Sequence, residues 1–370
     1  MYQVIIIGGG LGGLLTAILL GRAGISTLVI EKKIYPFHKV CGEYISNEVT
    51  PYLHSIGLFP LEFSPPQINR LQITSNGGKI SEIALPMGGF GISRFQLDHF
   101  WYLKALESGV KFQLDTSASS IRYKNGLTRV LTKQGTSFEA QVVIGAFGKR
   151  SLMDKHLKRS FMRDKSGYVG IKYHIKHPWE PGLIALHSFD HGYCGISMVE
   201  EEKLNLCYLS NRSNLRMHGD IDSLEKNVLS QNPFLASILA SSERLFTKPL
   251  VINEISFAPK KVIENHILMI GDAAGMITPL CGNGMAMAIH SAKILAPRVT
   301  RFFQQKSYVR VQMEDDYKME WDRKFSRRLL AGRYLQSLFH HKLAAEVLVQ
   351  VTRIPYLAQW MVRQTHGEEL

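Results

Sequence analysis

The stretch Val4-Ile5-Ile6-Ile7-Gly8-Gly9-Gly10-Leu11-Gly12-Gly13, close to the start of the 370-residue chain, decides the fold. Its β-branched run, residues 4–7, predicts a short buried strand. Apolar residues then recur at helical spacing after the glycines, and a second buried run over residues 27–30 ends at Glu31. Strand, turn, helix and strand in this order predict a βαβ unit with two parallel strands.

The glycines of this unit follow the pattern Gly8-x-Gly10-x-x-Gly13, placed between a strand and a helix. The first permits a tight turn, the second lets the backbone approach a pyrophosphate, and the third lets helix and strand pack closely. Glu31 follows at the distance where a carboxylate accepts hydrogen bonds from adenosine ribose hydroxyls. The unit therefore predicts binding of the ADP half of a dinucleotide at the helix N-terminus. Leu11, Gly12 and Lys32 complete the expected contacts.

A second strand and turn lie far downstream. The apolar run 267–270 ends in Gly271-Asp272-Ala273-Ala274-Gly275, and Pro279 and Gly282-Asn283-Gly284-Met285 then open a helix. FAD extends beyond its pyrophosphate into a ribityl chain and an isoalloxazine ring, which need further polar contacts. We expect Asp272 to contact the ribityl chain and the amides of residues 282–285 to meet the flavin edge. The dinucleotide is therefore predicted to be non-covalent FAD rather than NAD.

With both elements in place, the chain resembles the FAD-dependent group of aromatic hydroxylases, tryptophan-type halogenases and geranylgeranyl reductases over roughly residues 1–305. The resemblance also rests on Lys39-Val40-Cys41-Gly42-Glu43 and on Ser93-Arg94. It implies that Arg94 lies near the FAD pyrophosphate and that the backbone at Ala118 meets the adenine. It also places Lys39, Cys41 and Gly42 beside the flavin. Cys41 and Glu43 are weak catalytic candidates, and Cys41 can equally be a small residue packed in a loop.

The chain departs from this family at two places. Phe147 stands where hydroxylases of the group carry an aspartate that contacts cofactor phosphates, which argues against a tightly regulated NADPH site. Residues 192–197 lack the tryptophans of the halogenase signature. Halogenation is therefore a minor alternative.

The expected fold class is α/β: a Rossmann-like FAD-binding domain of the glutathione reductase type, a mostly antiparallel β substrate domain and C-terminal helices. Hairpin signals, strand runs and helical periodicity divide the chain into segments. FAD-binding segments are expected at 1–65, 93–160 and 262–305, substrate-sheet segments at 66–92 and 161–261, and a helical cap at 306–370. Helices are expected over residues 47–58, 94–107 and 221–239.

Composition limits the partners and the compartment. The net charge of +13 favours a polyanion, an anionic membrane surface or an acidic ligand, but the basic residues are scattered, so nucleic acid is not expected. Four cysteines without a CxxC pair predict neither a metal site nor disulfides, as in a reducing cytoplasm. The uncharged run 4–21 resolves into strand, turn and helix rather than a transmembrane segment. A basic, apolar C-terminal region around Arg327 and Arg328 suits either a packed cap or peripheral membrane contact.

The first functional hypothesis is an FAD-dependent monooxygenase, supplied with electrons by NADH or NADPH. It would oxidise a hydrophobic aromatic, polyketide or lipid-like substrate, free or presented by a carrier or membrane, as in secondary metabolism. The alternatives are a geranylgeranyl reductase-like enzyme that saturates prenyl double bonds, a halogenase, and a non-catalytic lipid-binding flavoprotein. His187 and His191 fall near the substrate sheet, where a lone histidine is more often structural than catalytic.

Overall fold

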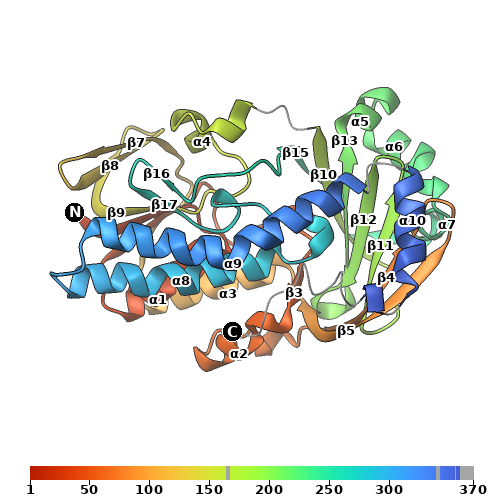
Figure 1. The fold of residues 1–370 in the computed structure, drawn as a ribbon, viewed down its shortest axis with the longest axis horizontal. Helices are drawn as coiled ribbons and strands as arrows, with labels where there is room; N and C mark the ends of the chain where they lie inside the picture. The colour runs from red at the N-terminus through yellow and green to blue at the C-terminus, as the bar shows by residue number, and fades with distance from the viewer. Residues whose placement is uncertain (164–166, 339–341, 355, 359–370) are drawn as a thin grey trace.

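A computed structural model describes residues 1–163, 167–338, 342–354 and 356–358. Two sheets form its framework, one at each end of the molecule (Figure 1). The first has the order β16-β17-β9-β1-β2-β6, with the hairpin β7–β8 attached through β9. Its central strands β1, β2, β9 and β17 run parallel. The bounds are β1 (Tyr2–Ile7), β2 (Thr27–Ile30), β6 (Lys111–Gln113), β7 (Ala118–Lys124), β8 (Leu127–Thr132), β9 (Ser137–Gly145), β16 (Ile263–Glu264) and β17 (Ile267–Met269).

Long helices pack on the first sheet. Helix α1 (Leu11–Arg22) lies between α3 (Arg94–Glu107) and α8 (Gly284–Gln304), and α9 (Arg310–Leu338) packs along α8 (Figure 1). The Tyr317 hydroxyl of α9 donates to the Met269 carbonyl at the end of β17 at 2.6 Å. Parallel strands covered on both faces are typically apolar along their whole length. The central runs of β1, β2 and β9 fit this rule, since they are apolar and almost fully buried.

The second sheet is mostly antiparallel, in the order β14-β10-β13-β12-β11-β4-β5-β3, with β15 also paired to β10. Its strands are β3 (Tyr44–Ser46), β4 (Gln67–Thr74), β5 (Ile80–Gly91), β10 (Tyr168–Lys176), β11 (Leu183–Phe189), β12 (Gly192–Met198), β13 (Leu204–Asn211), β14 (Glu243–Arg244) and β15 (Leu250–Ile255). Short helices α5 (Arg212–His218), α6 (Ile221–Asn227), α7 (Pro233–Ser241) and α10 (Lys342–Thr352) lie beside it, whereas α2 (Thr50–Ser55) and α4 (Leu152–His156) belong to the core of the first sheet (Figure 1).

The expected fold class is confirmed by the two sheets and the C-terminal helices. Three local expectations are corrected. The stretch 221–239 is broken into α6 and α7 because Asn232 caps a new helix before Pro233, and α5 precedes it unforeseen. The stretch 47–58 is a 3₁₀ turn followed by α2, whose N-terminus carries Pro51. Residues 44–46, which fall in the expected FAD-binding segment 1–65, form β3 and pair with β5 in the second sheet. Apart from β3, we propose that the two domains divide the chain at the boundaries expected from the sequence.

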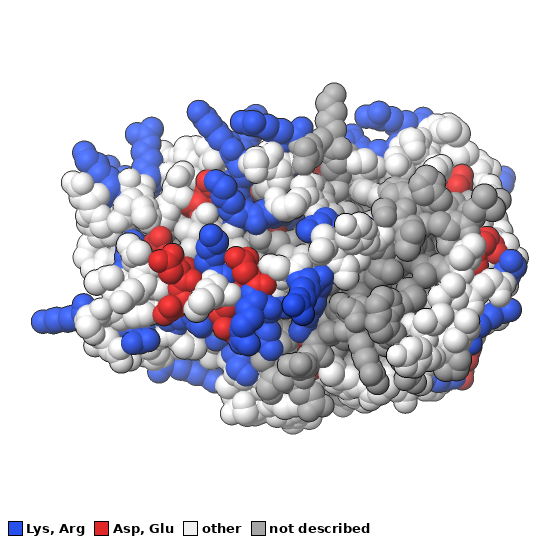
Figure 2. Space-filling model, viewed as in Figure 1, with Lys and Arg blue, Asp and Glu red and all other residues white. Residues whose placement is uncertain are grey.

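The charged side chains of the visible face are mixed rather than gathered by sign (Figure 2). In Figure 2, Lys and Arg side chains spread along the upper edge and the middle of the face, where Asp and Glu lie among them. Arg327 is exposed, whereas Arg328 turns inward to the buried Glu48 at 3.5 Å. Within the described part of the chain, no helix is long and apolar enough to cross a membrane. Part of the expected helical cap, residues 339–341, 355 and 359–370, lies outside the described residues.

Candidate flavin site

The glycine turn between β1 and α1 has the geometry that its sequence predicts. Gly8 has φ +105°, and a Cβ there would lie 2.4 Å from the Ala146 carbonyl oxygen. A Cβ on Gly13 would lie 2.1 Å from the Gly8 carbonyl oxygen, so only glycine allows α1 to pack on β1. At Gly10 the nearest atoms are the side-chain nitrogens of Arg94 and Lys39, at 3.6 and 3.8 Å. Gly10 therefore leaves room for a ligand rather than for protein.

Glu31 closes the other side of this turn. Its buried carboxylate accepts hydrogen bonds from the Gly9 amide at 2.7 Å and from the Lys33 amide at 3.2 Å. Two amide donors use part of the capacity of a carboxylate, which has about four lone-pair positions. Glu31 can thus fix the turn and still accept bonds from ribose hydroxyls.

Two cations face the open side of Gly10. The guanidinium of Arg94 binds both oxygens of Asp98 at 2.8 Å, and Lys39 Nζ binds the same carboxylate at 2.7 Å. Although burial alone would raise the pKa of Asp98, Arg94 and Lys39 lower it. Two positive charges and one negative leave a net charge of +1 beside the N-terminus of α1. That combination suits a diphosphate.

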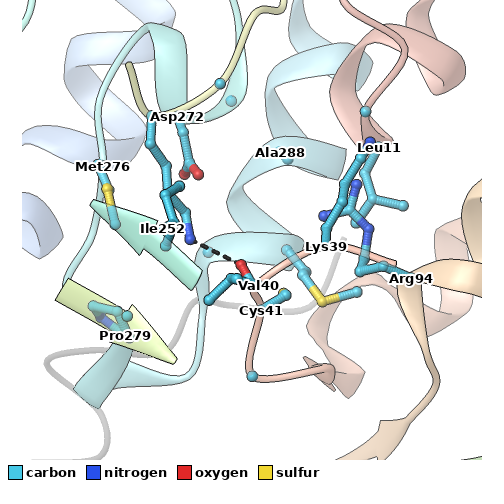
Figure 3. A pocket seen from close by; sticks show the side chains of 18 of the residues that line it. Leu11, Lys39, Val40, Cys41, Arg94, Ile252, Asp272, Met276, Pro279 and Ala288 are labelled. Atoms are coloured by element: carbon cyan, nitrogen blue, oxygen red, sulfur yellow. Dashed lines mark hydrogen bonds between the residues drawn. The ribbon is translucent and has the colours of Figure 1, made fainter. Parts of the chain in front are cut away.

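The second strand-turn faces this cluster across the pocket (Figure 3). Gly271, at φ +55°, begins a 3₁₀ turn, and its amide donates to Ser291 Oγ at 3.1 Å. Lys260 Nζ stabilises this turn by donating hydrogen bonds to the carbonyl oxygens of Asp272 and Lys149, each at 2.7 Å. Burial lowers the pKa of Lys260 to about 8. The Asp272 side chain is left directed toward the pocket (Figure 3).

One cavity of about 880 Å³ joins these elements. Of the cofactor-binding residues expected from the sequence, all but one line it: Gly8, Gly10, Leu11, Gly12, Gly13, Glu31, Lys32, Lys39, Cys41, Gly42, Arg94, Ala118, Gly271, Asp272, Pro279, Gly282, Gly284 and Met285. The exception is Asn283, which is buried as the N-cap of α8. Phe147, which replaces the family's aspartate, lines the cavity as well.

Sequence reasoning missed the far wall of this cavity. Strands β4, β5 and β11 contribute only aliphatic side chains to the lining: Leu71, Ile73, Ile83, Leu85, Ile184 and Leu186. Thr352 and Ala358, from and just beyond α10, close the wall. These strand residues alternate with others along the chain, so period-two patterning could have grouped them on one face. Their position opposite the glycine turn was not encoded locally.

The two weak catalytic candidates have different surroundings. Cys41 lines the cavity between the cation cluster and Asp272 (Figure 3). The carboxylate of Glu43 is fully buried and binds His174 Nε2 at 2.6 Å and the ammonium of Lys172. Burial opposes ionisation, but Lys172 and His174 outweigh it and lower the pKa of Glu43 to about 2. Glu43 therefore remains a carboxylate at neutral pH, which does not suit a general acid.

The two histidines near the substrate sheet are absent from the cavity lining. His191 is exposed in the turn after β11. His187 is buried, with Nδ1 2.8 Å from Thr74 Oγ1, and burial lowers its pKa to about 4. Asn232 donates to the same hydroxyl at 2.9 Å, so Thr74 is assigned as donor to Nδ1. His187 is thus a neutral structural residue.

Acidification is expected to destabilise the protein through His187. Its pKa is lower in the folded state, so the unfolded chain takes up the proton first as the pH falls from 6.5 to about 4. Over that window the site should cost roughly 3 kcal/mol of stability. Urea unfolding of the wild type and of His187→Leu at pH 7 and pH 4.5 measures this: the loss on acidification should be smaller in the variant. Equal losses in both proteins would contradict the assignment.

The fold and the cavity together define a protein of the two-sheet flavin-binding class. A sequence model of the FAD binding domain matches residues 1–63. Menaquinone reductase of Mycobacterium tuberculosis is 24% identical over 80% of this chain and 75% of its own. Digeranylgeranylglycerophospholipid reductase 2 of Methanopyrus kandleri is 22% identical over 93% and 89%. Conditioned medium factor receptor 1 of Dictyostelium discoideum is 22% identical over 99% and 77%.

Solved structures share the whole architecture. The flavin-dependent brominase Bmp2 matches with a TM-score of 0.80 at 16% identity, over 98% of this chain and 93% of its own. A geranylgeranyl bacteriochlorophyll reductase-like protein of Thermoplasma acidophilum matches with a TM-score of 0.80 at 18% identity, over 100% and 96%. The chain thus shares its fold with a flavin-dependent brominase and a geranylgeranyl bacteriochlorophyll reductase-like protein, and it has a digeranylgeranylglycerophospholipid reductase among its sequence relatives. The match to the FAD binding domain over residues 1–63 supports FAD as its cofactor.

Proposed function

We propose that this protein is an FAD-dependent reductase that saturates carbon–carbon double bonds in an isoprenoid lipid. The observation that carries the proposal is the aliphatic wall in the same cavity as the glycine turn and the cation cluster. We propose the residues that line the glycine turn, the cation cluster and the Gly271 turn as the FAD site. The names of the two reductase relatives, which act on menaquinone and on a digeranylgeranyl lipid, support the same class of substrate.

The register of the second sheet builds the aliphatic wall. Leu71 of β4 lies between Ile83 of β5 and Ile184 of β11, and Ile73 lies beside Leu186 in the next row. Such a surface gains about 25 cal/mol for each Å² of apolar ligand that it removes from water. It offers no charged group to a polar aromatic substrate, so it favours a long hydrocarbon chain.

The chemistry divides between the cofactor and the chain. When bound, reduced FAD supplies a hydride, and a proton from another group completes the saturation of one double bond. The aliphatic wall would hold the alkene and exclude water. Cys41 lies at the junction of wall and cation cluster and is our candidate for the proton donor. We propose NADH or NADPH as the source of electrons.

The proposal is tested by anaerobic turnover. Purified holoenzyme is given NADH, NADPH or dithionite together with menaquinone or a digeranylgeranyl glycerolipid, and the products are analysed by mass spectrometry. A gain of two hydrogen atoms per double bond without oxygen supports a reductase. A product that forms only with O₂ and carries one added oxygen atom overturns it.

The second candidate is the monooxygenase that the sequence predicts, acting on a hydrophobic substrate in the same cavity. It is favoured by the fold shared with flavin-dependent brominase Bmp2 and by the ability of reduced flavin to react with O₂. The oxygen-dependent arm of the experiment above distinguishes the two, because the same lipids and donors are used in both.

Narrowing the wall should weaken lipid binding without affecting FAD. Leu186→Trp places an indole beside Ile73, and we expect the KM for the lipid to rise roughly tenfold, equivalent to about 1.4 kcal/mol. Steady-state kinetics and FAD titration measure the two effects separately. Leu131→Trp, at an exposed position of β8 outside the cavity lining, is the matched control. An unchanged KM in Leu186→Trp would show that the substrate does not use this wall.

A further inference from the structure

Residues 39–43 cross from the cation cluster to the second sheet, and each of their carbonyl oxygens has a specific donor. Lys172 Nζ donates to the Lys39 oxygen at 3.2 Å. Lys149 Nζ donates to the Val40 oxygen at 3.1 Å, and Figure 3 draws this bond to Val40 as a dashed line. The remaining bonds are Asn205 Nδ2 to Cys41 at 3.2 Å and to Gly42 at 2.8 Å, Ser197 Oγ to Gly42 at 3.3 Å, and the Ile92 amide to Glu43 at 3.1 Å. Five consecutive carbonyls are therefore fixed from outside the segment.

This pattern determines where the amides point. In a planar trans peptide, the carbonyl of one residue and the N–H of the next are directed oppositely. Because the carbonyls of Val40, Cys41 and Gly42 are bound by protein donors, the amides of Cys41, Gly42 and Glu43 are directed away from those donors. All these residues line the cavity, and a Cβ at Gly42 would meet no atom within 4 Å. Open space thus adjoins the α-carbon of Gly42, which lies between two of these amides.

Glu43 fixes the end of the segment. It adopts φ +53°, a left-handed conformation that is strained for a glutamate. Its carboxylate accepts from the Arg94 amide at 2.7 Å and from His174, and it pairs with the ammonium of Lys172. The side chains of Glu43 and Lys172 are both fully buried. The cluster that stabilises this conformation is therefore shielded from water, so a hydrogen bond lost from it is not readily replaced by one to solvent.

The register of the second sheet places the polar side chains that bind residues 39–43 in one row. His174 of β10 pairs with Asn205 of β13, which pairs with Ser197 of β12. Ser197 in turn pairs with Ile184, where the aliphatic wall begins. One row across the sheet is thus polar under residues 39–43 and aliphatic under the substrate part of the cavity.

We propose that Glu43, Lys172, His174 and Asn205 are a positioning cluster for the flavin reaction. They hold the amides of residues 41–43 toward the cavity, where the amides stabilise the negative charge that FAD gains on reduction. The cluster thereby sets both the affinity for FAD and its reduction potential. The inference requires FAD binding but neither of the two proposed reactions, so failure of the lipid assays would leave it standing.

The test removes the buried ion pair without changing the net charge. Glu43→Gln combined with Lys172→Gln should weaken FAD binding roughly tenfold and lower the midpoint potential of the bound flavin. The readouts are FAD titration of the apoprotein and spectroelectrochemistry of the holoprotein. The matched control is Glu48→Gln with Arg328→Gln, which removes another buried carboxylate–cation pair, outside the cavity lining. It should lower the melting temperature and change neither readout.

A second variant covers the case in which the double variant does not fold. Asn205→Ala keeps every charge and removes only the bonds to the Cys41 and Gly42 carbonyls. It should lower the flavin potential in the same direction. Wild-type FAD affinity and potential in Asn205→Ala would overturn the proposal, as would equal changes in the Glu48 and Arg328 control.

Discussion

Replacing Gly10 with valine is expected to leave the apoprotein folded and to reduce its affinity for FAD by at least about a hundredfold. Gly10 has an extended conformation open to other residues, and its added Cβ would meet only side-chain nitrogens at 3.6 Å or more. A branched side chain there would occupy the space that a diphosphate needs beside the N-terminus of α1. Flavin content after purification and FAD titration of the apoprotein measure the loss.

The same substitution at Gly13 is the contrasting control. A Cβ there would overlap the Gly8 carbonyl oxygen at 2.1 Å, so Gly13→Val should fail to fold or melt at a much lower temperature. Gly10 is thus expected to be required for ligand binding, and Gly13 for the packing of α1 on β1. A Gly10→Val protein that retains FAD at wild-type stoichiometry would show that the cofactor lies elsewhere.

The second large effect is expected at Asp98. Asp98→Asn removes the buried partner of both Arg94 and Lys39, and we expect the free energy of unfolding of the apoprotein to fall by about 3–5 kcal/mol. Saturating FAD should recover part of the loss, because its diphosphate offers the cations a new anion. Urea unfolding with and without FAD measures both effects.

An exposed pair gives the control for Asp98. Glu139 binds Arg129 across β8 and β9, where the side chain of Arg129 is largely exposed and that of Glu139 is partly exposed. Glu139→Gln should change the free energy of unfolding by less than about 1 kcal/mol, with no recovery on adding FAD. If Asp98→Asn behaved like this surface variant, the cation cluster would not depend on its carboxylate.

The sequence predicted the glycine turn well because its information is local. Gly8, Gly10 and Gly13 each act through backbone geometry within a few residues, and Glu31 follows at the end of the neighbouring strand. Asp272 could be proposed for the same reason, since it lies in a second glycine-rich turn that follows a buried strand. Asn283, expected among the amides of residues 282–285, is the buried N-cap of α8, and its contact with the cofactor stays a prediction.

Other parts depended on partners far away in the chain. Glu43 was a weak acid–base candidate from its motif alone, yet its role follows from Lys172 and His174, which lie about 130 residues downstream. The aliphatic wall likewise needs β4 beside β11 and the C-terminal region across it, where the buried Val349 of α10 packs in one cluster with Ile73 and Ile83.

By itself the sequence determined the βαβ unit of the FAD binding domain, a second glycine-rich strand-turn at residues 271–275 and the two-sheet class. Backbone conformation at glycines and the apolar runs of buried strands are encoded within ten or so residues. Only the tertiary structure decided that residues 39–43 are fixed from the second sheet and that the cavity continues into an aliphatic wall. Both depend on strand register, and a shift of one residue would turn Asn205 and Leu71 to the opposite face.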